Sequence, residues 1–505
     1  MDKSSLTINR EKILLFFILL VGLALRLYRL GEMDFSGDEA CSIVYSRVWH
    51  QLFTDNHPPL YYKILGYWIN LFGETEFRAR MLSALFSLGT VLMISKLGKV
   101  IFNRQVGLIS AFIMAVTPIH IYYAQEARSY ALMTFLFSIA LYVFILIIYK
   151  EKKNLWGIFT ILLLLSVITE YICFPILIST GSVFLFKRFR HHFKKWILCW
   201  FIVLLGFSVW IPVFWMQFTN IARDFWIQQV GVISVIKTFY HFSLGYTGGS
   251  YVLGCIVFLF IGVRGIFFIK REERWKNILL LSIIIVPIVT LAILSYAIRP
   301  VYLTRQLLPV SICYYLLIAS GLDKLKGIKV KFLLSALIIL MTMNALYNYY
   351  YKAAEIIKKP FRPMAAYLKD NIKKDDIICL TTLQHSTPLL YYLHNYSREN
   401  DFYVDTYLLR PKKNDNGKIL SITELSMENF IAKHEYKSYN TTTDLILKDA
   451  RRVWLILGSL KRDGSLDNDS LIVRDCFEQD RSRIQTKEFD GLFVESYSIN
   501  DHADR

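Results

Sequence analysis

Charged residues are scarce in this sequence. They make up 19% of the 505 residues, whereas a soluble globular protein has about 25%. Hydrophobic residues reach 54%, and the mean hydropathy is +0.39. Several apolar runs are about 18 residues or longer, which is enough to cross a hydrocarbon core of about 30 Å. The composition excludes a single soluble globule, a disordered chain and a fibrous repeat, and it predicts a membrane protein.

Cysteine is also rare, with seven residues in the chain. No Cys-x-x-Cys pair or His-rich tract is present, so the sequence indicates no structural metal site. Cys379 and Cys476 could form a disulfide if they face an oxidising compartment. A P-loop and a Gly-x-Gly-x-x-Gly motif are absent as well, so no nucleotide-binding fingerprint is present. The first apolar run is too long for a cleavable signal peptide, and we expect it to remain as an anchor.

The net charge of +18 lies in one part of the chain. Residues 351–505 contain 24 Lys and Arg against 24 Asp and Glu, so this part is neutral. Residues 1–350 contain the other 34 basic and 16 acidic residues and carry the whole excess. These basic residues lie mostly between apolar runs, a pattern typical of membrane topology. The charge therefore points to a lipid bilayer, and we predict no nucleic-acid partner.

Eleven apolar runs predict transmembrane helices, and we expect 11 to 13 spans. The runs cover 13–29, 79–98, 106–121, 130–149, 155–169, 171–186, 196–214, 251–269, 278–297, 307–322 and 332–349. The connections alternate in basic content, with 22 Lys and Arg in one set and 11 in the other. By the positive-inside rule the richer set is cytoplasmic. We therefore predict a multi-pass protein of the cytoplasmic (inner) membrane, with the poorer set of loops facing outward.

The pattern changes after Tyr350, which predicts two domains. Residues 1–350 form a membrane domain without internal repeats, and residues 351–505 form an extracytoplasmic soluble α/β domain. In the second domain, periodicity predicts helices at 364–372 and 387–395 and buried strands at 376–382 and 452–458. Residues 492–499 alternate as an edge or terminal strand does. The predicted fold class is a polytopic α-helical membrane protein with a C-terminal α/β domain.

Two outward loops contain the residues best suited to chemistry. Loop one (30–77) carries Asp38, Glu39, His57 and Tyr61, and loop two (121–129) carries Glu126 and Arg128. Such groups are costly at a membrane surface unless they have a function. Carboxylates can bind hydroxyls and accept a proton, guanidinium groups pair with phosphate, and tyrosine rings can stack on a sugar. This mixture suits a sugar joined to a lipid phosphate.

Several segments carry a resemblance to a known family. They are GDEACSIVYSR (37–47), NHPPLYYKILGYWINLFG (56–73), RARMLSALFSLGTV (78–91), YYAQEARSYAL (122–132) and RPVYLTRQLLPVSICYYLLIASGL (299–322). Together they resemble the polyprenyl-phosphate-sugar-dependent glycosyltransferases of the GT-C fold. The protein O-mannosyltransferase and lipid A aminoarabinose transferase families are the most similar. The resemblance covers most of the membrane part and implies a GT-C membrane domain.

The resemblance also implies roles for individual residues. Asp38 matches the loop-one aspartate that acts as catalytic base, and Glu39 is its neighbour in the Asp-Glu pair. Glu126 falls at the loop-two carboxylate, and Arg305 matches an arginine beside the lipid phosphate. The substrate-binding candidates are Glu39, His57, Tyr61, Glu126, Arg128 and Arg305. The aminoarabinose transferases have a Glu-Lys pair where this chain has Asn56 and His57, so no cofactor is certain and a divalent metal stays open.

These residues predict a reaction. A monosaccharide moves from a polyprenyl-phosphate donor to a hydroxyl on a protein, lipid or cell-surface glycan. Asp38 takes the hydroxyl proton, and Arg128, Arg305 or both hold the charge of the departing lipid phosphate. One base and one leaving group imply a single displacement with inversion.

Two other functions compete with this prediction. A transporter or flippase of lipid-linked sugars would place charges and helix breaks at mid-membrane. A polysaccharide ligase would have a large outer loop between later spans, whereas loop 215–250 is moderate in length.

Structural explanations compete at each site as well. Asp38 and Glu39 could cap a helix, and Glu126 and Arg128 could be an interfacial ion pair. His57 could only shape the turn before Pro58, and Arg305 could anchor its helix at the interface. We expect no role in the site for Asp34 and Asp55, as solvated loop residues, or for His191 and His192, in a basic run. Glu170 is either a turn residue between two spans or part of the site, and the turn is slightly favoured.

Overall fold

The chain separates into two compact units. The computed structural model describes residues 3–47, 57–220, 229–247, 252–267, 273–298, 300–353, 359–373, 376–397, 406–414, 417–424, 438–439, 452–458, 466, 468–489 and 492–498. The first unit comprises Met1–Gly31 and Asp55–Tyr351, and the second comprises Glu32–Thr54 and Lys352–Arg505. The division near residue 351 coincides with the change in composition. Residues 32–54, in loop one, belong to the second unit.

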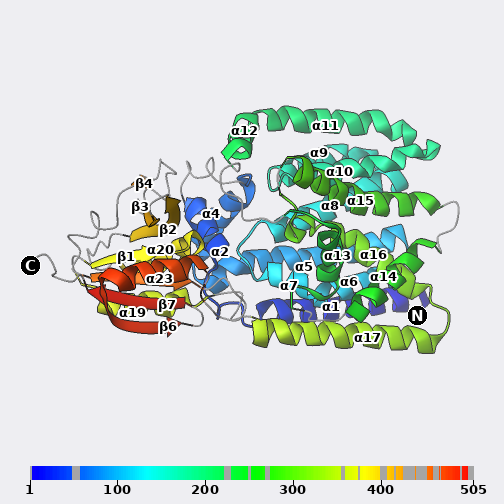
Figure 1. The fold of residues 1–505 in the computed structure, drawn as a ribbon. Helices are drawn as coiled ribbons and strands as arrows, with labels where there is room; N and C mark the ends of the chain where they lie inside the picture. The colour runs from blue at the N-terminus through cyan, green and yellow to red at the C-terminus, as the bar shows by residue number, and fades with distance from the viewer. Residues whose placement is uncertain are drawn as a thin grey trace, which may run out of the picture. The chain divides into compact units, whose positions relative to one another are not determined.

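The first unit is built from helices, whose order is visible in Figure 1. Its α-helices are α1 (Lys3–Leu27), α4 (Leu60–Phe72), α5 (Glu76–Ile101), α6 (Arg104–Val116), α7 (Pro118–Ala124), α8 (Tyr130–Lys150), α9 (Trp156–Val167), α10 (Cys173–Ile178), α11 (Phe193–Ser208), α12 (Ile211–Asn220), α13 (Val232–Leu244), α14 (Val252–Phe267), α15 (Arg274–Ala297), α16 (Val310–Asp323) and α17 (Ile328–Tyr347). Short 3-10 turns are η1 (Lys153–Leu155), η2 (Ser179–Leu185), η3 (Lys187–His192) and η5 (Thr304–Leu307), and η6 (Asn348–Ala353) is a π-helical turn. Each of the eleven predicted apolar runs overlaps at least one of these helices.

Four of the described helices are long and apolar enough to cross a membrane. They are Glu76–Ile101, Tyr130–Lys150, Arg274–Ala297 and Ile328–Lys352. Two pairs of helices that bend by 60° and 70° would raise the count to six if each pair is one span. The predicted total of 11 to 13 spans stays a prediction.

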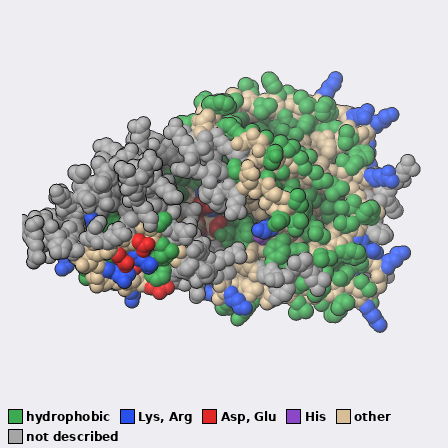
Figure 2. Space-filling view, viewed as in Figure 1, with side chains coloured by type: hydrophobic (Ala, Val, Ile, Leu, Met, Phe, Trp, Pro, Cys, Tyr) green, Lys and Arg blue, Asp and Glu red, His purple; other side chains and the backbone are tan. Residues whose placement is uncertain are grey.

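Lys and Arg side chains mark the ends of these helices. Lys99 lies in the last turn of α5, Lys150 ends α8, and Arg274 begins α15. Figure 2 shows apolar side chains over the visible face of the first unit, with Lys and Arg side chains gathered at one end of its helices. This distribution is what a helix bundle in a bilayer requires, because cations belong in the headgroup region.

A bend between α6 and α7 positions loop two. Helix α6 ends at Val116, its C-cap residue Thr117 is extended, and Pro118 begins α7. The Arg26 side chain is fully buried in α1 and donates hydrogen bonds to the carbonyls of Met114 (3.2 Å) and Ala115 (2.9 Å). Carbonyls at a helix C-terminus lack helical partners, so a guanidinium there is favourable. Arg26 thus stabilises the bend that leads into loop two.

The second unit contains a seven-stranded mixed sheet with helices. Its elements are α2 (Gly37–Arg47), α19 (Phe361–Asn371), β1 (Asp376–Leu380), α20 (Leu383–Ser397), β2 (Thr406–Asn414), β3 (Gly417–Glu424), β4 (Ser438–Tyr439), β5 (Arg452–Gly458), α23 (Asn468–Asp480), β6 (Ser482–Phe489) and β7 (Leu492–Ser498). The strand order is β4-β3-β2-β1-β5-β7-β6, with β1 parallel to both β2 and β5. The predicted elements of the α/β domain therefore match α19, β1, α20, β5 and β7. Strand β7 is the last strand in the chain but lies inside the sheet.

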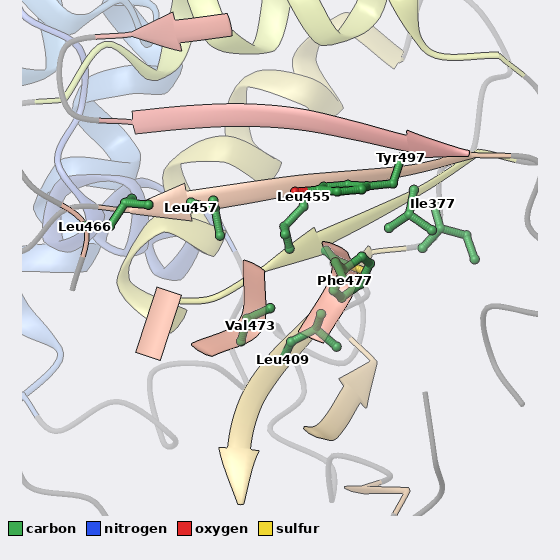
Figure 3. Close-up of a cluster of buried hydrophobic side chains, with 10 residues drawn as sticks. Ile377, Leu409, Leu455, Leu457, Leu466, Val473, Phe477 and Tyr497 are labelled. Carbon is green, nitrogen blue, oxygen red and sulfur yellow. The ribbon is translucent and has the colours of Figure 1, made fainter. Parts of the chain in front are cut away.

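The core of the second unit lies between β1, β5, β7 and α23. Figure 3 shows its members, which include Ile377, Leu455, Leu457, Leu466, Val473, Phe477 and Tyr497. Cys379 is buried in the same core with a free thiol. Cys379 therefore takes part in no disulfide in this structure, and the side chain of Cys476, its possible partner, lies outside the described residues. Burial in this apolar core raises the pKa of the Cys379 thiol to about 12, because a thiolate loses its hydration there.

Candidate active site

The predicted base, Asp38, lies in the first turn of α2. Ser36 and Glu39 form a capping box around it: the Ser36 N–H donates to Glu39 Oε2 (3.0 Å), and the Glu39 N–H donates to Ser36 Oγ (3.3 Å). The Ser-x-x-Glu spacing in the sequence is the signature of this motif. Glu39 is completely buried, whereas Asp38 is exposed. The helix N-terminus favours a negative charge at Asp38, so α2 presents an anionic carboxylate to solvent.

Loop two of the first unit is linked to loop one by a buried polar chain. Arg128 Nη2 lies 3.0 Å from His57 Nε2, and His57 Nδ1 lies 3.2 Å from Glu170 Oε1. The Ser129 hydroxyl also donates to the Glu170 carboxylate. Because a guanidinium can only donate, Nε2 must accept and Nδ1 must carry the proton toward Glu170. The carboxylate therefore fixes the tautomer of His57, and His57 orients Arg128.

The charge of Glu170 is set by this chain. Its carboxyl is buried in the turn between α9 and α10, and burial raises its pKa. His57, Ser129 and Arg128 oppose burial, and the net pKa lies below the ordinary value of 4.5. Glu170 is thus ionised at neutral pH and compensated by its partners, as a buried carboxylate must be. The sequence slightly favours a plain turn residue at this position, but in the structure Glu170 contacts His57 of loop one and Ser129 of loop two.

Two arginines share one tyrosine ring in the first unit. The Tyr130 ring is buried at the start of α8, with Arg128 Cζ at 5.8 Å and Arg305 Cζ at 5.6 Å from its centroid. Arg128 comes from loop two, and Arg305 comes from η5, 177 positions later in the sequence. We call Arg128 and Arg305 the arginine pair. Both guanidinium groups thus lie within about 6 Å of the centre of one aromatic ring, and guanidinium groups are well suited to bind a phosphate.

Tyrosines surround the arginine pair. The Tyr123 and Tyr130 rings are 5.1 Å apart, and the Tyr123 and Tyr246 hydroxyls are 2.6 Å apart. Burial raises the pKa of Tyr246 to about 12, and the nearby Arg305 opposes this rise while Glu126 adds to it. Glu126 itself is 8% exposed. Glu126 and Arg305 therefore both influence the pKa of this tyrosine, although they come from distant segments of the sequence.

Tyr61 lies beneath loop two. It is completely buried, and its hydroxyl lies 3.2 Å from Ser83 Oγ, which donates to the Arg128 carbonyl (3.4 Å). The next residue, Tyr62, accepts a hydrogen bond from Arg128 Nη1 (3.5 Å). Tyr61 thus stabilises the backbone of Arg128 through Ser83, and Tyr62 stabilises the Arg128 side chain. A substrate contact by Tyr61 stays a prediction.

Metal ligands gather elsewhere in the first unit. Within the described ranges, one group of three carries ligand atoms within 4.8 Å of one another: Glu151, His191 and His192. Glu151 is the C-cap residue after α8 and has a left-handed backbone conformation (φ 54°), and its Oε1 lies 3.4 Å and 3.3 Å from the Nε2 atoms of the two histidines. The sequence analysis gave these histidines no role, and none of the predicted site residues belongs to this group.

Comparisons with known proteins agree with the motifs. Residues 56–216 match the family model described as dolichyl-phosphate-mannose-protein mannosyltransferase. The fold is similar to ArnT from Cupriavidus metallidurans in the apo state, with a TM-score of 0.59 and 12% identity, over 95% of this chain and 97% of that chain. The same protein bound to undecaprenyl phosphate gives a TM-score of 0.59 and 11% identity, over 95% and 97% of the two chains.

A second similar fold is the apo form of the oligosaccharyltransferase of Archaeoglobus fulgidus. It gives a TM-score of 0.50 and 12% identity, over 76% of this chain and 64% of that chain. No curated protein matches the sequence. At these identities the structural likeness shows the fold, and the family match supports the enzyme class. The prediction from the motifs is confirmed: the chain is a membrane glycosyltransferase of the GT-C fold.

Proposed function

We propose that this protein transfers a monosaccharide from a polyprenyl-phosphate donor to an acceptor hydroxyl, with inversion at the anomeric carbon. The observation that supports this most is the arginine pair on the Tyr130 ring. A lipid-phosphate leaving group develops negative charge as the glycosidic bond breaks, and preorganised cations lower the barrier to that step. ArnT binds undecaprenyl phosphate, which is a donor carrier of this class.

The polar chain behind the pair supports the same role. His57, which is itself bound to Glu170, accepts a hydrogen bond from Arg128 Nη2, and the Tyr62 hydroxyl accepts one from Arg128 Nη1. Orientation fixed before the reaction avoids reorganisation during it. The tyrosines around Arg305 offer ring faces to the sugar, and Glu126 offers a carboxylate to its hydroxyls.

Asp38 supplies the base in this proposal. It removes the proton of the acceptor hydroxyl while that oxygen attacks the anomeric carbon, and the bond to the phosphate oxygen breaks. The proton stays on Asp38, and the leaving lipid phosphate keeps the electron pair. A single displacement of this kind inverts the anomeric centre. The acceptor is a hydroxyl of a protein, lipid or cell-surface glycan.

The orientation of the protein follows from its basic residues. The connections rich in Lys and Arg face the cytoplasm by the positive-inside rule. We therefore place the protein in the cytoplasmic membrane, with loop one, loop two and the α/β domain outside. A transporter of lipid-linked sugars remains the second candidate, because α6–α7 and α11–α12 are bent pairs of apolar helices, and broken helices are typical of transporters.

The substitution Asp38→Asn tests the proposed function. In membrane vesicles with a labelled polyprenyl-phosphate sugar, we expect sugar transfer to fall about 10³-fold, because a general base contributes about 10²- to 10⁴-fold. The matched control is Asp370→Asn, because Asp370 is an exposed aspartate of α19 in the same unit and has no role in the proposed reaction. This variant should transfer sugar at nearly the wild-type rate. Wild-type transfer by Asp38→Asn would overturn the assignment of the base.

A further inference from the structure

Helix α2 packs within the second unit, although its sequence lies in a loop of the predicted membrane domain. Its buried face includes Ala40, Ile43 and Val44, which are at most 4% exposed. Cys41 Sγ lies 3.7 Å from Thr387 Oγ1, in α20. Helix α2 is therefore a component of the α/β unit as a matter of packing.

The segment that leads into α2 has contacts with the same unit. The buried Phe35 N–H donates to the Tyr392 hydroxyl (2.8 Å), and the Phe35 ring lies edge-on to Tyr391 with centroids 5.5 Å apart. Both tyrosines belong to α20. The backbone three residues before Asp38 is thus fixed by a side chain of the α/β unit.

An ion pair adds a third contact. Asp34 Oδ2 accepts from the Arg362 N–H (2.7 Å), and Arg362 Nη2 lies 3.2 Å from Asp34 Oδ1. Arg362 is the second residue of α19, where backbone N–H groups lack helical partners, so Asp34 caps that helix from outside. Asp34 is 8% exposed. The expectation that Asp34 is a solvated loop residue was therefore wrong.

From these contacts we infer that the α/β domain positions the catalytic base. Asp34, Phe35 and Cys41 bracket Asp38 in the sequence, and all three are held by α19 or α20. Arg362, Tyr392 and Thr387 are accordingly positioning residues for Asp38. This inference rests on the proposed function, because it takes Asp38 as the base. The α/β domain is then part of the catalytic apparatus and not an accessory.

A disulfide between α2 and α20 tests whether this arrangement is the active one. In Thr387→Cys the new sulfur stands where Thr387 Oγ1 contacts Cys41, and a small rotation brings the two sulfurs to bonding distance, about 2.05 Å. We expect the disulfide to form on oxidation, as shown by peptide mass spectrometry, and transfer to stay within about two-fold of the reduced enzyme. Failure of the disulfide to form would contradict the packing. Loss of transfer on oxidation, with recovery on reduction, would overturn the inference. Cys41→Ala in the same background controls for other cysteines.

Removal of the Arg362 side chain, the partner of Asp34 in α19, is a second test of whether the α/β domain positions Asp38. In Arg362→Ala we expect kcat to fall between about 10-fold and 100-fold, because small displacements of a catalytic group cost this much, while the KM for donor stays unchanged. Arg362→Lys should recover part of the rate. The matched control is Arg483→Ala, because Arg483 is 43% exposed against 41% for Arg362 and pairs with Glu478 and Glu495 in the same unit.

The outcomes separate this inference from the proposed function. Equal losses of kcat in Arg362→Ala and Arg483→Ala, with Asp38→Asn inactive, would overturn the positioning role and leave the base assignment intact. An active Asp38→Asn would instead overturn the proposed function. Thermal unfolding of each purified variant shows whether it is folded, and a loss of kcat confined to Arg362→Ala among folded variants supports the inference.

Discussion

The two units hold their candidate groups in different ways. In the first unit, Arg128 and Glu170 are at most 5% exposed and are joined through His57, so a polar chain fixes the side chains themselves. In the second unit, Asp38 is exposed, and the contacts fix the residues around it. In the proposed function, the buried network preorganises charge for the leaving group, and the exposed carboxylate of Asp38 is open to the acceptor. Substitutions at the site residues of the first unit should therefore weaken the binding and use of the donor. Substitutions in the second unit should leave donor binding unchanged.

The largest effect on the donor is expected from the arginine pair. Arg128→Ala and Arg305→Ala should each lower kcat/KM for the labelled lipid-linked sugar by about 10²-fold, because in the proposed function each cation stabilises the leaving phosphate. The double variant should lose less than the product of the single losses, since the two groups share the Tyr130 ring. The control is Arg188→Ala, because Arg188 lies 5.7 Å from the Tyr149 ring centroid in the same unit. An equal loss in the control would contradict a specific role.

A smaller loss of kcat/KM is expected from substitution of His57, which contacts Arg128 of the arginine pair. His57→Ala should lower kcat/KM by about 10-fold, because loss of one buried hydrogen-bond partner costs about 1–3 kcal/mol. In an Arg128→Ala background the same substitution should have little further effect if His57 acts through Arg128. Independent, fully multiplied losses would show that His57 has a direct role in the reaction.

The contribution of Glu170 to the stability of the protein changes with pH in a direction that can be predicted. The pKa of Glu170 is lowered in the folded protein, so its contribution to stability is present above the ordinary value of 4.5. That contribution is lost as the pH falls through the lowered pKa. Glu170→Gln should remove this component of the acid limb in thermal unfolding scans. An unchanged acid limb would mean that Glu170 does not titrate with folding.

The smallest effect on donor binding is expected from Gly458→Ala in the second unit. A Cβ on Gly458 would lie 2.0 Å from His385 Cε1, and overpacking of this kind costs about 1–3 kcal/mol. The free energy of unfolding of the α/β unit should fall, while donor binding stays at the wild-type level. The control is Gly231→Ala, because a Cβ there has no atom within 4 Å. Weaker donor binding in Gly458→Ala would show that the two units do not divide the reaction as proposed.

Hydrophobic periodicity predicted the elements that are continuously apolar. Helices α5, α8 and α15 are long and apolar, and β1 and β5 are buried on both faces, so hydropathy alone located them. Strand β2 was missed because it contains Pro411. This proline lies beyond Thr406–Leu408, the part of β2 that pairs with β1, so it removes no hydrogen bond on that side of the sheet.

The site was only partly predictable for a related reason. The Asp-Glu pair, the Ser-x-x-Glu cap and the loop-two arginine are local patterns. The contact between His57 and Glu170 spans 113 positions, and no local pattern records it. Likewise, residues 32–54 read as part of a membrane loop, and only tertiary packing shows that α2 lies against α20.

The contact between Phe35 and Tyr392 also has a consequence for synthesis. The two residues are 357 positions apart, so a ribosome adding about 5–20 residues per second needs about 20–70 s to make the second after the first. During that interval the nascent chain holds an α2 without α20 to pack against. In the proposed function, the donor-binding residue Arg305 is made before α20, whereas Asp38 is fixed only after α20 is made. A growing chain would then acquire its proposed donor site first and its fixed base last.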